Sequence, residues 1–87
     1  MSVKRSRLEI IRNILEWASQ SWGVEKTHII FQSNLSNDLI EKYLNFVVDK
    51  KLVDVTVESD GRRLFRTNNR GREYIDKFRE LENTLAF

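Results

Sequence analysis

The sequence predicts a small α+β fold in which three helices are followed by a β-hairpin and a last helix. Two observations predict it. Apolar residues recur at helical spacing up to residue 51, and between residues 52 and 67 they alternate with polar residues on either side of an Asp-Gly pair. The chain has 87 residues, of which 40% are hydrophobic, which is enough for one core. We therefore expect a single domain over residues 1–87.

The first helix is predicted to begin at Ser6. Ser6 and Glu9 have the spacing of a capping box, and apolar residues follow at helical intervals to about Gln20. Gly23 suits a turn, and residues 24–26 are expected to be extended. Residues 27–32 then form a short second helix, which needs tertiary support because it has only about two turns.

The third helix is predicted over residues 36–50. Ser36 is a favourable N-cap, and Leu35 can pack on Ile40 as a hydrophobic staple. At 3.6 residues per turn one side of this helix is apolar, and we expect it to be centred on Leu39, Tyr43, Phe46, Val47 and Lys50, widened by Ile40 and Leu44. The opposite side is polar and carries Asn37, Asp38, Glu41, Lys42, Asn45 and Asp49.

Two strands are predicted over residues 52–58 and 63–67. The Asp60-Gly61 pair between them is favoured in tight hairpin turns. Asn68 offers an N-cap for the last helix, residues 68–86. The apolar residues of that helix have the spacing of a two-heptad seam, which predicts a dimer interface or packing on the helix's own domain. They are Tyr74, Ile75, Phe78, Leu81 and Leu85.

This order of elements is that of a winged helix-turn-helix, with residues 6–67 as the helix-turn-helix plus wing. In that arrangement the third helix enters the major groove of DNA and the hairpin lies along a neighbouring groove or the phosphates. A small α+β domain without a nucleic-acid partner has the same order of elements, so the alternative stays open.

Positive charge is concentrated in two segments, although the net charge is only +2. Residues 1–12 have four basic residues against one acidic residue, and residues 59–72 have five arginines against one aspartate. Residues 73–87 are acidic overall, and residues 36–50 have three acidic residues against two lysines. Attraction to phosphate should therefore come mainly from outside the third helix.

Several short motifs resemble those of archaeal winged-helix DNA-binding proteins. The chain is similar to the ten-kilodalton chromatin-type group, and to related archaeal or archaeal-virus regulators, over residues 6–82. Asn68 stands where that group usually has a threonine. The resemblance implies a homodimer joined by the last helices. The motifs are Leu8-Glu9-Ile10-Ile11, Ile14-Leu15-Glu16, Lys26-Thr27, Asn34-Leu35-Ser36, Lys42-Tyr43 and Gly71.

Candidate DNA-binding residues fall into three groups. Polar residues of the third helix can reach base edges or phosphates. Arginines of the hairpin suit phosphate contact or minor-groove insertion. Basic residues at the N-terminus can form an arm, and residues at the start of the second helix lie where backbone amides also favour phosphate. In these groups we place Ser36, Asn37, Glu41, Lys42 and Asn45; Arg62, Arg63 and Arg66; and Arg5, Arg7, Lys26 and Thr27. Solvated polar positions are the alternative interpretation for each.

The other conspicuous side chains are assigned to the core or to solvent. We expect the large aromatic residues Trp17, Trp22, Phe31, Tyr43, Phe46 and Phe65 to be buried. His28 is the only histidine, there is no cysteine, and the three glycines form no phosphate-binding loop. The sequence therefore predicts no enzymatic site, metal, cofactor or small-molecule ligand.

The sequence thus predicts a double-stranded DNA-binding transcriptional regulator that acts as a homodimer. The absence of cysteine, of a signal peptide and of a membrane span leads us to expect a cytoplasmic protein, at the nucleoid or in the host cytoplasm if it is viral. Two alternatives remain, namely an architectural, chromatin-like protein that binds any duplex and a winged helix that binds another protein.

Overall fold

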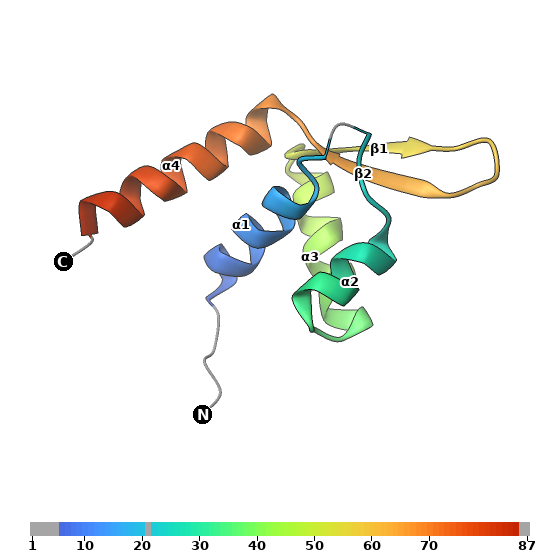
Figure 1. Ribbon diagram of the computed structural model, residues 1–87, viewed down its shortest axis with the longest axis horizontal. Helices are drawn as coiled ribbons and strands as arrows, with labels where there is room; N and C mark the ends of the chain where they lie inside the picture. Colours follow the sequence, from blue (N-terminus) through green and yellow to red (C-terminus); the bar gives the residue numbers. More distant parts are fainter. Residues whose placement is uncertain (1–5, 21, 86–87) are drawn as a thin grey trace.

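The structure is a computed structural model that describes residues 6–20 and 22–85. Within these ranges it has four helices and a two-stranded antiparallel sheet, which confirms the predicted α+β fold. Figure 1 shows α1, α2 and α3 gathered into a helical body, from which the hairpin and α4 extend in opposite directions. The elements in order are α1 (Arg7–Trp17), α2 (Lys26–Ser33), α3 (Asn37–Asp49), β1 (Val53–Val57), β2 (Arg63–Thr67) and α4 (Asn69–Leu85).

Helix α1 begins as predicted and ends three residues earlier than predicted. The Ser6 hydroxyl accepts a hydrogen bond from the backbone N–H of Glu9. The helix ends at Trp17 because strand β2 satisfies its last carbonyl groups: the Thr67 hydroxyl donates to the carbonyl of Leu15 over 2.6 Å, and the Thr67 N–H donates to the carbonyl of Ala18 over 2.8 Å. These bonds also explain how a threonine can be buried at this position.

The turn between α2 and α3 is held by its own polar side chains. Asn34 has the left-handed conformation, with φ of 58°, which asparagine tolerates better than most residues. The Ser33 hydroxyl donates to the carbonyl of Ile30 and accepts from the N–H of Leu35. Ser36 accepts from the N–H of Leu39, so the predicted N-cap of α3 is confirmed.

The buried side of α3 is rotated from the predicted one. Ile40, Leu44 and Val47 are buried, whereas Leu39 and Phe46 are 36% and 43% exposed. Our predicted centre of the apolar side was therefore wrong. The residues that α3 turns toward α1 and α2 are the buried row Ile40, Leu44 and Val47. The helix ends in a Schellman arrangement in which the N–H of Leu52 donates to the carbonyl of Val47.

The hairpin pairs Val53 with Thr67 and Val57 with Arg63 at the two ends of its register. Strand β2 pairs on its other side with Val24, through two hydrogen bonds between Val24 and Phe65. The predicted extended piece is confirmed for Val24 and Glu25, whereas Lys26 already belongs to α2. The bridge also fixes the root of the hairpin against the start of α2, while the tip of the hairpin projects from the body (Figure 1).

Helix α4 begins at the predicted cap, where the Asn68 side chain accepts from the N–H of Gly71. Gly71 is buried at the point where α4 crosses the chain between α3 and β1. A Cβ atom here would collide with the carbonyl oxygen of Leu52 and lie 2.6 Å from Cγ2 of Thr67. The close approach of α4 to the sheet therefore requires glycine at this position.

The core lies between the helices and the inner face of the hairpin, and aliphatic residues dominate it. Phe65 is buried as predicted, and Trp17 and Tyr43 are partly buried. The prediction was wrong for Trp22 and Phe31, which are 79% and 83% exposed, and for Phe46. The buried hydrophobic residues are Ile10, Ile11, Ile14, Leu15, Ala18, Val24, Ile29, Ile40, Leu44, Val47, Leu52, Val53, Phe65 and Ile75.

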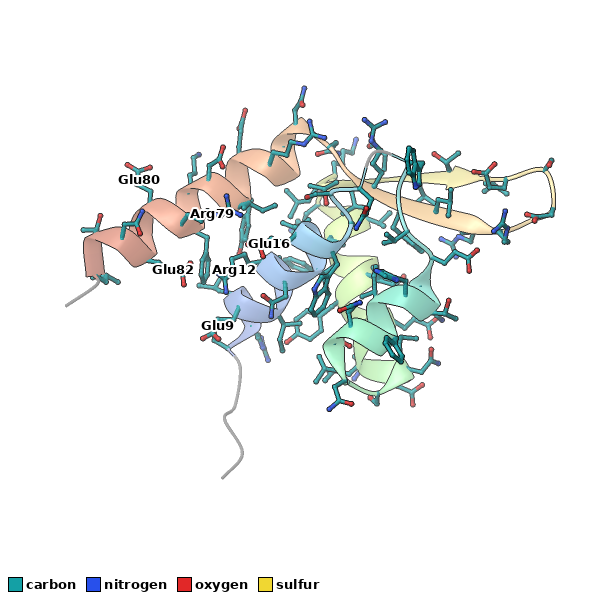
Figure 2. The ribbon with its side chains drawn as sticks, viewed as in Figure 1. Glu9, Arg12, Glu16, Arg79, Glu80 and Glu82 are labelled. Atoms are coloured by element: carbon teal, nitrogen blue, oxygen red, sulfur yellow. The ribbon has the colours of Figure 1, made fainter. Side chains whose placement is uncertain are left out.

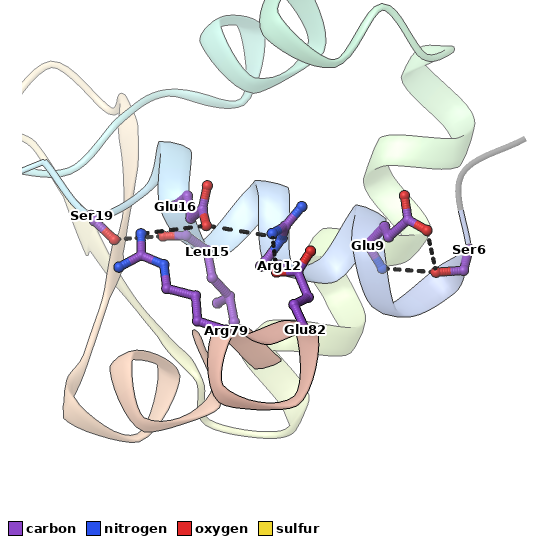
Figure 3. A network of polar contacts seen from close by, with 8 residues as sticks. All are labelled: Ser6, Glu9, Arg12, Leu15, Glu16, Ser19, Arg79 and Glu82. Carbon is purple, nitrogen blue, oxygen red and sulfur yellow. Dashed lines mark hydrogen bonds and ion pairs between the residues drawn. The ribbon is translucent and has the colours of Figure 1, made fainter. Parts of the chain in front are cut away.

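A network of charged side chains joins α1 to α4 (Figure 2). The Arg12 guanidinium donates to Glu82 and lies 4.8 Å from the centre of the Phe78 ring. Glu16 faces both Arg12 and Arg79, at 3.9 and 3.7 Å (Figure 3). These contacts hold the second half of α4 beside α1, beyond the point where Ile75 enters the core.

Candidate nucleic-acid interface

The outward side of α3 is polar, as predicted. All five candidate residues of this helix and its cap, Ser36, Asn37, Glu41, Lys42 and Asn45, are exposed. Lys42 makes no ion pair among residues 6–20 and 22–85. Asn45 lies one turn further along, so an amide and an ammonium group are both presented to solvent from the same side. This side can donate to and accept from base edges.

The start of α2 lies beside α3. The Lys26 ammonium is 4.0 Å from the carboxylate of Glu41, so the two helices of the helix-turn-helix are linked by opposite charges. Thr27, the next residue, is exposed. Glu41 is thus partly neutralised inside the protein, which makes the outward side of α3 less acidic than its sequence indicates.

Arg62, near the hairpin tip, is held by two carboxylates. Its Nη1 atom lies 3.0 Å from Oε1 of Glu25, and its Nε atom lies 2.8 Å from Oδ2 of Asp60. The charge of Asp60 and the hydrogen bond to Glu25 raise the pKa of Arg62. In turn the backbone N–H of Arg62, followed by its charge, lowers the pKa of Asp60. The tip of the hairpin is therefore a fixed cluster of charges.

The other two hairpin arginines are less engaged. Arg63 lies over the ring of Phe65, with 5.4 Å between the guanidinium carbon and the ring centre. Arg66 is exposed, and it makes no ion pair in the part of the chain that the structure describes. Arg63 and Arg66 project from opposite faces of β2 because three residues separate them along a strand.

A hollow of about 280 Å³ lies between the hairpin and the start of α2. It brings together four of the twelve candidate DNA-binding residues from two distant segments. Its lining residues are Glu25, Lys26, Thr27, Gly61, Arg62, Arg63 and Phe65. Glu25 is not among the residues predicted from the sequence. The one signal that could have found it is its place directly before α2, where a negative charge complements the positive end of the helix dipole.

Arg7, the described member of the basic N-terminal candidates, is not part of this hollow. Arg7 is exposed at the first position of α1, which begins at the end of the body away from the hairpin (Figure 1). Arg5 lies outside the described residues. The site in the structure therefore consists of the outward side of α3, the start of α2 and the hairpin.

Other kinds of site find no support within the described ranges. No cluster of three metal-binding side chains occurs in residues 6–20 and 22–85. In the same residues, no helix has the length and apolar character needed to cross a membrane.

Comparison with known proteins identifies the fold family. The model of a family described as winged helix-turn-helix matches residues 4–86. The chain belongs to this winged helix-turn-helix family. Accordingly α3 occupies the recognition position and the hairpin is the wing. No curated protein sequence matches the chain.

Solved structures show the same winged helix-turn-helix fold. One is a MarR-family transcriptional regulator from Rhodococcus sp. RHA1, with a TM-score of 0.76 and 18% identity over 86% of this chain and 54% of that chain. Another is Sso10a-2, a DNA-binding protein from Sulfolobus solfataricus, with a TM-score of 0.74 and 21% identity over 93% of this chain and 85% of that chain.

A third is MepR from Staphylococcus aureus, a transcription regulator of the multidrug efflux pump MepA. It has a TM-score of 0.70 and 19% identity, over 92% of this chain and 62% of that chain. The winged-helix chain thus spans about half to two thirds of these two regulators and most of the Sulfolobus protein. The shared part is the winged helix-turn-helix fold.

Proposed function

We propose that the protein is a double-stranded DNA-binding transcriptional regulator. The observation that carries the proposal is the combination, on one winged helix, of an exposed polar side of α3 and a projecting wing whose Arg63 and Arg66 are exposed and make no ion pair within the described residues. In this geometry α3 enters the major groove and the wing lies along the backbone or the adjacent minor groove. Occupancy of the site then blocks or recruits the transcription machinery.

Affinity and selectivity are divided between the two elements. Arg63 and Arg66 supply phosphate contacts that do not depend on sequence. Asn45 and Lys42 supply groups that can discriminate between base pairs, since an asparagine amide matches the edge of adenine and a lysine matches guanine. Lys26 and Thr27 add phosphate contacts at the start of α2, and Ser36 and Asn37 do so at the start of α3.

We further propose a homodimer joined through α4. Leu81 and Leu85 are 52% and 58% exposed, and they lie on the same side of α4 as Tyr74. Leu8 of α1, 51% exposed, adds to this apolar surface. Ile75, a member of the predicted seam, is buried in its own domain, and Phe78 is partly buried against Arg12.

The interface we propose therefore uses the last two turns of α4 and the start of α1. Two copies would place two recognition helices about one helical turn of DNA apart. The resemblance to archaeal chromatin-type proteins and the shared fold with the Sulfolobus protein support an archaeal or archaeal-virus regulator. We place it at the nucleoid, or in the host cytoplasm if it is viral.

The test is a titration of the protein against a library of random duplexes at about 50 and about 200 mM salt. A regulator selects a subset of sequences, and its binding to that subset survives the higher salt better than its binding to the remainder. Equal affinity for all sequences, with a steep loss on adding salt, would assign the protein to the architectural class instead. An absence of binding at the lower salt concentration would exclude DNA binding.

One surface favours a second function, the binding of another protein. Phe31 and Trp22 are the two most exposed large hydrophobic side chains among the described residues. Phe31 lines a groove of about 540 Å³ together with His28 and Leu64. Exposed aromatic side chains of this kind are typical of protein contacts. If the titration shows no DNA binding, this groove is the place to search for a protein partner.

A further inference from the structure

The side chain of Glu25 makes its hydrogen bond away from the helix that it precedes. Glu25 is the N-cap residue of α2, but glutamate is not one of the short side chains, Ser, Thr, Asp and Asn, that usually cap a helix. It makes no capping hydrogen bond. Instead the carboxylate accepts from Nη1 of Arg62 over 3.0 Å, across 37 positions in the sequence.

The pairing is fixed by the backbone around it. Val24 and Phe65 exchange two backbone hydrogen bonds, so the segment before α2 lies alongside β2. The Arg62 carbonyl accepts from the N–H of Glu58 over 2.7 Å, which closes the wing turn. Two ordered backbone segments thus bring Glu25 and Arg62 within reach of each other.

The pair lies inside the proposed interface. Glu25, Lys26, Arg62 and Arg63 line one hollow, so a DNA backbone that contacts this hollow meets a carboxylate among three cations. The Arg62 side chain is 61% exposed, and that of Glu25 is 37% exposed, so both can be reached by a phosphate. A phosphate that binds Arg62 has to compete with Glu25 and also with Asp60, whose Oδ2 atom lies 2.8 Å from Nε of Arg62.

We propose that Glu25 limits the affinity of the wing for DNA: its carboxylate, beside that of Asp60, competes with DNA phosphates for Arg62 and so lowers the affinity for DNA of every sequence. The proposal rests on the proposed function. A backbone contact adds equal free energy to all duplexes and carries no sequence information. Weakening that contact therefore lowers the affinity for all duplexes alike, and the difference in binding free energy between sequences, which comes from the base-reading side of α3, is unchanged.

The test compares Glu25→Gln with wild type on a random-sequence duplex at about 50 and about 200 mM salt. The glutamine side chain of this variant keeps an oxygen that can accept from Arg62, so the wing geometry is preserved while the charge is removed. We expect about 3-fold to 10-fold tighter binding at the lower salt concentration. The slope of log affinity against log salt should steepen by up to about 0.9, the value for one added phosphate contact.

The matched control is Asp76→Asn, which makes the same change in net charge. Asp76 is exposed on α4 and makes no ion pair within residues 6–20 and 22–85. Its affinity should remain within about twofold of wild type, because a charge outside the interface is largely screened. A gain as large as that of Glu25→Gln would show that net charge alone is responsible and would overturn the proposal.

A second comparison tests whether Glu25 acts through Arg62. In the Arg62→Gln background, adding Glu25→Gln should change affinity by less than about twofold, because the cation that pairs with Glu25 has already been removed. A persisting gain would overturn the proposal, as would a Glu25→Gln variant that binds no more tightly than wild type. If wild type and all variants fail to bind duplex, the proposed function fails together with the role of Glu25.

Discussion

Arg12 of α1 and Glu82 of α4 lie 70 positions apart in the sequence and form the shortest ion pair among the described residues, at 2.6 Å. The guanidinium group of Arg12 also lies over the ring of Phe78. It faces Glu16 as well (Figure 3). The Arg12 Nε atom is buried without a hydrogen-bond acceptor in the part of the chain that the structure describes. One side chain therefore links two helices through charge, ring contact and packing of its stem.

We expect Arg12→Met to lower the free energy of unfolding by about 1 kcal/mol. Methionine keeps most of the apolar stem and removes the ion pair and the cation–π contact, which are each worth about 0.5–1 kcal/mol when partly exposed. Thermal unfolding followed by circular dichroism measures the change, with a fall in Tm of roughly 4–8 °C. Arg79→Met is the control, since Arg79 pairs with Glu16 at 3.7 Å and is 61% exposed; an equal decrease there would contradict the special role of Arg12.

Gly71 and Gly61 are required for different reasons: Gly71 by lack of space for a Cβ atom, and Gly61 by its positive φ. Gly71→Ala should lower the free energy of unfolding by about 3 kcal/mol, because the new Cβ atom collides with the Leu52 carbonyl and with Thr67. In Gly61→Ala the new Cβ atom meets no atom within 4 Å, so only the strain of an alanine at a φ of 89° remains. This strain should lower the free energy of unfolding by about 1 kcal/mol. Denaturant unfolding of both variants checks the order. The reverse order would show that α4 does not approach the sheet as closely as described.

The local parts of this fold could be predicted from the sequence, and the distant contacts could not. The Ser36 cap, the Asp60-Gly61 turn and the Asn68 cap depend on residues within three or four positions, so short-range chemistry determines them. Exposure of Trp22 and Phe31 depends on which faces the other helices cover. The sequence alone does not show which faces are covered, so a large aromatic residue is predicted to be buried by its hydrophobicity alone. The prediction for these two residues was wrong for that reason.

The candidate site shows the same division. Composition and turn chemistry were enough to place a cluster of arginines on a hairpin. The pairing of Arg62 with Glu25 and of Lys26 with Glu41 could not be predicted, because each joins segments that only the tertiary fold brings together. These pairs alter the charge that the interface presents, so the electrostatics of the site are a property of the fold.

The wing turn should titrate at acidic pH. The pKa of Asp60 is lowered from its ordinary value of 3.8, first by the backbone N–H of Arg62 and also by the Arg62 charge. A carboxyl group with a depressed folded-state pKa contributes stability above its unfolded-state pKa, and this contribution is lost as pH falls through the folded-state pKa. We therefore expect the turn to lose the stabilising contacts of Asp60 with Arg62 as the pH falls below 3.8. The NMR signal of the Asp60 carboxyl carbon, followed against pH, measures this change.

The variant Arg62→Gln separates the two causes of this pKa shift. It retains the backbone N–H, which is the larger cause, and removes the charge. The pKa of Asp60 should rise only part of the way toward its ordinary value. A complete return would show that the charge dominates and that the backbone hydrogen bond to Asp60 is not formed in solution.

Arginines of the wing and the asparagine of α3 should affect DNA binding differently. Arg63→Ala with Arg66→Ala should weaken binding to all duplexes and reduce the salt slope by about 0.9 for each phosphate that the wing no longer binds. Asn45→Ala should change the preferred sequence with little effect on that slope. Selection from a duplex library, with affinities at two salt concentrations, measures both. A change in sequence preference from the wing variant alone would reverse the assigned roles.

Leu81→Glu should convert a dimer into monomers. Leu81 is 52% exposed on the apolar side of α4, and a carboxylate buried at a dimer interface without a partner is strongly unfavourable. Sedimentation velocity measures the change of mass, and the isolated domain should keep its fold because Leu81 is not part of the core. Asn83→Glu adds the same charge two residues further on, on the opposite side of the helix, and should leave the dimer intact. A Leu81→Glu variant that remains dimeric would show that the interface lies elsewhere. If both variants dissociate, the cause is charge repulsion between whole helices and not the loss of a defined apolar contact.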